Sequence, residues 1–144
     1  MSITWVVVAD KTVAKIFVLG QIKGELVFLK EIDNPEGRLK AGEIGYDKPG
    51  QLDNPMHGNS KTFERANPKE VELDRFAHHI ADVIETGRVN HSFNRLVLIM
   101  GPHFHGTLAK ALNPHVIDMV HKIIHKEYTH MPTAELYQHV IELD

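Results

Sequence analysis

The most constraining feature of the sequence is the run Thr4–Ala9, which reads Thr-Trp-Val-Val-Val-Ala without interruption by a charged residue. A strand with one solvated face alternates apolar and polar residues. This continuous β-branched run therefore predicts a strand that is buried on both faces. The other predicted elements must supply its neighbours.

Two further strands are predicted directly after the first one. Asp10 and Lys11 turn the chain, and the apolar segment Val13–Leu19 ends at Gly20. A second short turn leads to Leu26–Ile32. Strands joined by such short connections predict an antiparallel meander.

A helix is predicted after residue 67. Asn67 is a good N-cap, Pro68 suits the first helical position, and Glu70 stands three residues after the cap. The apolar positions that follow have helical spacing: Leu73, Phe76, Ala77, Ile80 and Ile84. Gly87 predicts the end of this helix.

The last third of the chain predicts a strand over Phe93–Met100, a short helix over Gly106–Leu112 and a terminal helix that opens at Pro132. Between them, Asn113 and Pro114 repeat the helix start signal. The following apolar residues fit either one helix, or a helical turn and then a strand over Val120–His125, and periodicity does not decide between the two.

The order of elements predicts an α/β fold built as one domain, residues 1–144. We expect a mixed β-sheet of about five strands, with an N-terminal antiparallel meander and helices packed on the sheet. The length of 144 residues suits a single core. One long loop, residues 34–67, interrupts the pattern with five of the ten glycines, and its opposite charges balance. Such a loop is either functional or a tolerated insertion.

Composition excludes several classes of protein. No apolar run reaches the roughly 18–20 residues of a membrane-spanning helix, so we expect no membrane insertion. The absence of cysteine excludes disulfides and thiolate chemistry and, with no recognisable signal sequence, predicts a cytoplasmic protein. A net charge of −3 argues against extensive coating of nucleic acid.

Candidate binding residues lie after the two most buried predicted strands. Asp10 follows the predicted strand Thr4–Ala9 and could bind a ligand or simply cap the turn. The turn Met100–Thr107 follows the predicted strand Phe93–Met100, and it could hold a phosphate or a carboxylate or simply connect strand to helix. Its candidate residues are Gly101, His103, His105, Gly106 and Thr107. The eleven histidines include close pairs, but no full ligand set is visible, so we predict no metal and no cofactor.

Ordered motifs along nearly the whole chain resemble a bacterial family known as host attachment proteins. They are Trp5–Asp10, Ala14–Phe17, Asp47–Gly50, Arg75–Ala77, Phe93–Leu98, Gly106–Leu108 and Lys126–Thr129. A more distant resemblance is to the middle domain of eukaryotic and archaeal peptide-chain release factors, which carry Gly-Gly-Gln in a loop before a long helix. Gly50 and Gln51 stand in the corresponding loop here, although Pro49 replaces the first glycine.

Three hypotheses about function follow: the resemblances imply the first two, and the turn at Gly101–Thr107 gives the third. The first is a non-catalytic binding domain that acts through a macromolecular partner, either a protein or the ribosome with its tRNA. The second is hydrolysis of the peptidyl-tRNA ester, with Gln51 as the candidate catalytic residue beside Gly50. The third is a domain that binds a small molecule or a phosphate. The oligomeric state is not predicted.

Overall fold

The computed structural model describes residues 2–20, 25–38 and 67–142, and these form one α/β domain. Five strands make one mixed sheet: β1 (Thr4–Ala9), β2 (Val13–Leu19), β3 (Leu26–Asp33), β4 (Arg95–Ile99) and β5 (Val120–Ile124). The strand order is β3-β2-β1-β4-β5. The first three pair antiparallel as the predicted meander, whereas β1, β4 and β5 run parallel. The predicted fold class is therefore confirmed.

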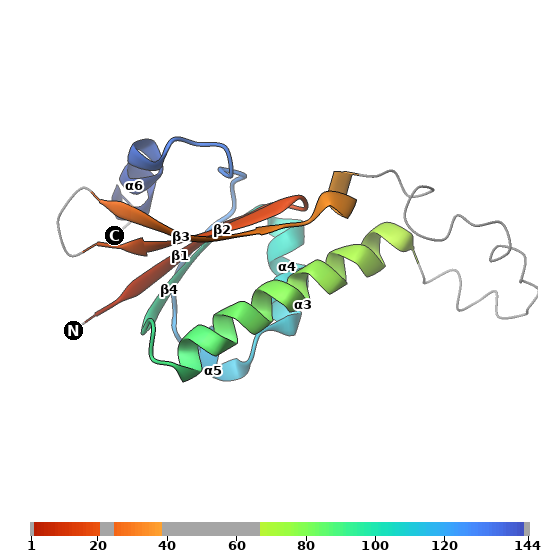
Figure 1. Ribbon diagram of the computed structural model, residues 1–144, viewed down its shortest axis with the longest axis horizontal. Coiled ribbons are helices and arrows are strands. Elements are labelled where there is room, and N and C mark those ends of the chain that lie inside the picture. The colour runs from red at the N-terminus through yellow and green to blue at the C-terminus, as the bar shows by residue number, and fades with distance from the viewer. Residues whose placement is uncertain (1, 21–24, 39–66, 143–144) are drawn as a thin grey trace, which may run out of the picture.

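The helices cover both faces of the sheet (Figure 1). Helix α3 (Pro68–Val89), helix α4 (Pro102–Ala111) and the short helix α5 (Pro114–Ile117) lie on one face. Helix α6 (Thr133–Glu142) lies on the opposite face. A short 3-10 helix, η1 (Pro35–Arg38), follows β3. No helix in the described ranges is long and apolar enough to cross a membrane.

The two faces of β1 explain its continuous apolar run. Trp5, Val7 and Ala9 point toward α3 and α4, where they join one core that includes Phe76. Val6 and Val8 point the other way and pack against α6 in a second core. Every side chain of β1 is thus buried, as a central strand requires.

Two predicted helix boundaries are wrong. Helix α3 continues past Gly87 to Val89, because Gly87 serves close packing and does not end the helix. A Cβ atom at Gly87 would lie 2.4 Å from Cη2 of Trp5, so α3 and β1 approach each other at a position that only glycine allows. Helix α4 begins at Pro102, where the sequence predicted Gly106, because Gly101 acts as the N-cap and Pro102 takes the first helical position.

The segment with two predicted alternatives is a helical turn followed by a strand. Asn113 caps α5, its side chain accepting a hydrogen bond from the amide of His115. The chain then enters β5, which pairs with β4. The backbone groups of β5 form their hydrogen bonds with β4, whereas in a helix they would form them within the segment itself. Because β4 is distant in the sequence, the local spacing of residues cannot show which of the two occurs.

Candidate functional site

A cleft of about 530 Å³ opens at the carboxyl ends of β1 and β4. Open α/β sheets bind ligands outside the carboxyl ends of parallel strands, between two neighbouring strands whose following strands lie on opposite sides of the pair. Here β1 and β4 are parallel neighbours; β2, which follows β1, lies beside β1, and β5, which follows β4, lies beside β4. The cleft is lined by the β1–β2 turn, η1, the first turns of α3 and α4, and Glu127 after β5: Asp10, Lys11, Thr12, Asn34, Glu36, Gly37, Lys69, Glu70, Glu72, Leu73, Gly101, Pro102, His103, Phe104 and Glu127.

Asp10 holds the floor of the cleft together. Its Oδ1 accepts hydrogen bonds from the amides of Thr12 and Val13 and from the Thr12 hydroxyl, at 2.7–3.0 Å. Its Oδ2 accepts the hydroxyl of Thr129 at 2.6 Å, which ties the β1–β2 turn to the segment after β5. Lys15 donates to the carbonyl oxygen of Thr129 at 2.7 Å. Both carboxylate oxygens of Asp10 are therefore occupied within the protein.

The pKa of Asp10 reflects this environment. Burial alone would raise the pKa, but the hydrogen bonds from Thr129, Thr12 and Val13 outweigh it. The pKa therefore lies below its ordinary value, and Asp10 is a carboxylate at neutral pH.

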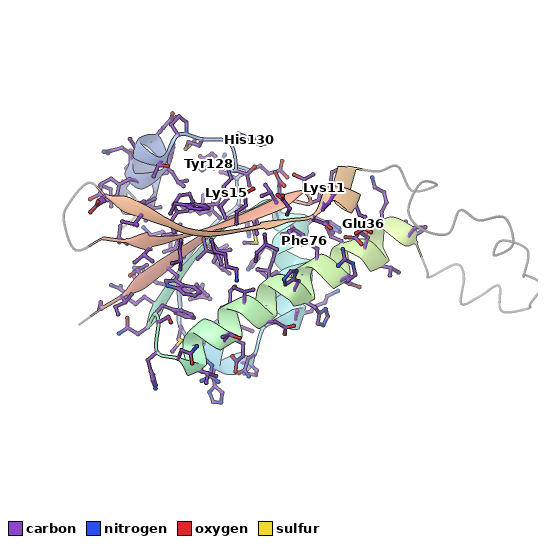
Figure 2. The ribbon with its side chains drawn as sticks, viewed as in Figure 1. Lys11, Lys15, Glu36, Phe76, Tyr128 and His130 are labelled. Atoms are coloured by element: carbon purple, nitrogen blue, oxygen red, sulfur yellow. The ribbon has the colours of Figure 1, made fainter. Side chains whose placement is uncertain are left out.

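Arg75 does not line the cleft itself, but it holds three residues that do: Glu72, Glu36 and Asn34. It holds the buried Glu72 through two hydrogen bonds, from Nε to Oε1 at 2.9 Å and from Nη2 to Oε2 at 2.7 Å. The same Nη2 reaches Glu36 at 2.8 Å and Asn34 at 3.2 Å, so it joins α3 to η1. The bonds to Glu72 are the main reason that the pKa of Arg75 is raised. Figure 2 shows Glu36 and Lys11 at the same end of the sheet, near the first turns of α3.

The first turn of α4 borders the cleft through His103 and Phe104. The N-cap Gly101 has no side chain to accept a hydrogen bond from the first amides of α4, and its carbonyl oxygen accepts one from the amide of His105 at 3.0 Å. His103 lies 3.3 Å from Glu70, whereas Phe104 is buried against Phe76 with their ring centroids 5.9 Å apart. Most of the predicted turn Met100–Thr107 is thus not a loop, because α4 already begins at Pro102 and Gly101 is its N-cap.

The sequence-predicted candidates are only partly brought together. Asp10, Gly101 and His103 line the cleft. His105, Gly106 and Thr107 lie within α4 and do not line the cleft. Gly106 is exposed, and the Thr107 hydroxyl donates to the carbonyl oxygen of His103 at 3.3 Å. Gly50 and Gln51, with most of the predicted loop 34–67, lie outside the described residues.

His105 belongs to a separate pair with His125. Nδ1 of His105 lies 3.2 Å from Nε2 of His125. Burial, and then the neighbouring His125, lower the pKa of His105. In residues 2–20, 25–38 and 67–142, no group of three acidic or histidine side chains converges as metal ligands.

Sequence reasoning missed most of the charged lining. Five carboxylates from four segments line the cleft, two of them from α3: Asp10, Glu36, Glu70, Glu72 and Glu127. The lysines among the lining residues are Lys11 and Lys69. Within the part of the chain that the structure describes, Lys11, Lys69 and Glu127 make no ion pair. Glu127 was not predicted as a residue of the site, because its position depends on β5, and the sequence left open whether that segment is a helix or a strand.

A family model described as "Protein required for attachment to host cells" matches residues 5–140. The chain belongs to this family. The resemblance inferred from the sequence motifs is thereby confirmed, and the cleft shows where several of those motifs meet. Asp10 from the first motif and Glu127 from the last line the cleft. Arg75 from the α3 motif and Thr129 from the last motif are bonded to lining residues, Glu72 and Asp10 respectively.

Other comparisons add little about this host attachment family member. No curated protein matches the chain. A solved structure titled "Archaeal protein" is similar at 8% sequence identity and a TM-score of 0.49; the match covers 98% of this chain. The chain spans 38% of that protein's length. The likeness to release-factor middle domains stays a prediction.

Proposed function

We propose that this host attachment family member is a non-catalytic binding domain that acts in the cytoplasm through a macromolecular partner, and that the cleft receives a basic segment of that partner. The observation that carries this proposal is the cleft at the carboxyl ends of β1 and β4, which is lined by five carboxylates from four segments of the chain. Its volume of about 530 Å³ is within the range of sites that hold a ligand or an anchoring group.

The charge of the cleft favours a protein over a nucleic acid at this site. The five carboxylates outnumber Lys11 and Lys69 even when Arg75 is counted with them. A phosphate backbone would be repelled here, whereas a lysine or arginine side chain would be attracted. The partner is therefore a protein, either alone or as a component of the ribosome, and contact with tRNA is made elsewhere if it is made at all.

Glu127 is the carboxylate best placed to meet such a group. Asp10 is occupied by Thr12, Val13 and Thr129, and Glu72 by Arg75. Glu127 is exposed and carries no hydrogen bond or ion pair in the described part of the chain. An exposed and unpaired carboxylate can approach an incoming cation without first breaking a contact of its own.

The two described ends of the segment 39–66 also border the cleft. Glu36 and Gly37 of η1 line it just before the segment, and Lys69 and Glu70 line it just after. A partner seated in the cleft would therefore lie beside the attachment points of the segment that carries Gly50 and Gln51. This proximity supports a partner larger than a small molecule.

The test is affinity capture from the native cell at moderate salt, with the wild type and Glu127→Lys. The variant places a cation in the cleft, so we expect it to recover at least about tenfold less of the partner. Asp82→Lys is the matched control, because it makes the same charge change at an exposed position of α3 that does not line the cleft.

Each outcome decides between the hypotheses. If ribosomal proteins are captured by the wild type and by Asp82→Lys but not by Glu127→Lys, the partner is part of the ribosome. If envelope proteins show this pattern, the partner is at the cell surface. Equal recovery with the wild type and Glu127→Lys would contradict the cleft as the site. Failure of the wild type to capture any macromolecule would favour the small-molecule hypothesis instead.

A further inference from the structure

Strand β3 leaves an apolar edge of the sheet uncovered in the described part of the chain. It is the outermost strand beside β2, and no other described strand pairs with its outer side. Three consecutive large side chains are exposed there: Val27 at 46%, Phe28 at 54% and Leu29 at 48%. Sheet edges of this kind are the places where chains pair with one another.

The exposed side chains lie on both faces of the sheet. Phe28 packs edge to face on Phe17, with their centroids 5.8 Å apart, on the face that α6 covers. Val27 lies opposite Val18, whose side chain packs against the core on the α3 face. A helix laid on one face would cover only one of these side chains. A strand paired along the edge covers both, so the edge fits an added strand.

A β-bulge sets which side chains share a face. In the pairing with β2, Phe28 lies opposite Phe17 and Lys30 lies opposite Ile16, so Leu29 is an extra residue. Lys30 therefore shares the α3 face with Val27. Alternation places Glu25 on that face as well, while Leu26 and Phe28 share the α6 face.

We propose that β3 pairs antiparallel with β3 of a second copy of this chain, about a two-fold axis at Val27. With Leu29 as the extra residue in both strands, Leu26 lies opposite Phe28 of the second copy, and Glu25 lies opposite Lys30. All opposed residues then share a face, and both ends of the pairing join a carboxylate to an ammonium group. This charge complementarity selects the second copy as the occupant.

A parallel pairing of two β3 strands does not bring opposite charges together. A parallel pairing in register would set Glu25 against Glu25 and Lys30 against Lys30, which is repulsive. The paired segment is short, so its interface is at the small end of the range for specific complexes. The dimer is therefore reversible and forms with increasing protein concentration.

Sedimentation equilibrium of the full chain tests the pairing. We expect the wild type to dimerise with concentration, and Glu25→Lys or Lys30→Glu to raise the dissociation constant about tenfold, since each turns two attractive pairs into repulsive ones. The double variant Glu25→Lys/Lys30→Glu restores the opposite charges and is expected to return the constant to within about twofold of the wild type.

The double variant makes the test specific to this geometry. A wild type that stays monomeric up to about 1 mM would overturn the proposal, because the edge would then be covered by something else. A dimer whose weakening by the single variants is not reversed by the double variant would overturn the antiparallel register. Circular dichroism of each variant checks that the fold is kept. Failure here leaves the proposed function untouched, because β3 does not line the cleft.

Discussion

Replacement of Asp10 by alanine is expected to lower the free energy of unfolding by about 2–4 kcal/mol at pH 7. The change leaves the Thr129 hydroxyl and the amides of Thr12 and Val13 without their acceptor. Thr129 is only 3% exposed, so its hydroxyl cannot regain a hydrogen bond from water without a local opening. Urea unfolding followed by circular dichroism measures the loss.

The effect of Asp10→Ala depends on pH with a definite sign. The pKa of Asp10 is lowered in the folded state, so its contribution to stability is complete above the ordinary value of 3.8. It is lost as the pH falls toward the folded pKa. The difference between wild type and variant should therefore be constant near neutral pH and shrink below about pH 4.

Thr129→Val is the matched control for the Asp10 network. It keeps the shape of the side chain and removes only the hydroxyl that donates to Asp10 at 2.6 Å. We expect a smaller loss, about 1–2 kcal/mol, and we expect the double variant with Asp10→Ala to lose less than the sum. An unfolding free energy of Asp10→Ala equal to that of the wild type would show that the carboxylate does not hold the floor of the cleft.

Replacement of Gly87 by alanine is expected to destabilise the protein by about 1–3 kcal/mol. Alanine normally stabilises a helix relative to glycine, but here the added Cβ would meet the ring of Trp5 at 2.4 Å. The ring packs against Phe93, with centroids 4.8 Å apart, and cannot move freely. Trp5 is the single tryptophan, so its fluorescence should change together with the unfolding midpoint.

Gly106→Ala is the paired substitution with the opposite expected sign. Gly106 also lies inside a helix, α4, but a Cβ atom there would have no heavy atom within 4 Å. The helix preference of alanine should therefore act unopposed and stabilise the protein by about 0.5–1 kcal/mol. If both substitutions changed stability in the same direction, the close approach of α3 to Trp5 would not be the cause.

The sequence predicts most of this fold because its main elements carry local signals. The unbroken run Thr4–Ala9 marks the central strand, and Asn67 with Pro68 marks the start of α3. The start of α4 has a weaker signal, since Gly101 offers no capping side chain. Strand β5 has none that is decisive, because its identity depends on pairing with a distant segment, β4.

The candidate site was less accessible to sequence reasoning. Asp10 could be singled out because it follows the buried strand β1, and His103 because it follows the buried strand β4. The cleft itself is formed by segments far apart in the chain, such as Asp10, Glu72 and Glu127. Their meeting depends on long-range contacts, such as the bond between Asp10 and Thr129, that no local spacing encodes.

Amide hydrogen exchange of the protein with its captured partner tests the central claim most directly. If a basic segment of the partner occupies the cleft, exchange should slow on binding at the β1–β2 turn, at the first turn of α4 and around Glu127. Glu127→Lys, added at the same partner concentration, should show little of this protection. Protection confined to α6 or to the edge of β3, with unchanged exchange around the cleft, would contradict the proposed site.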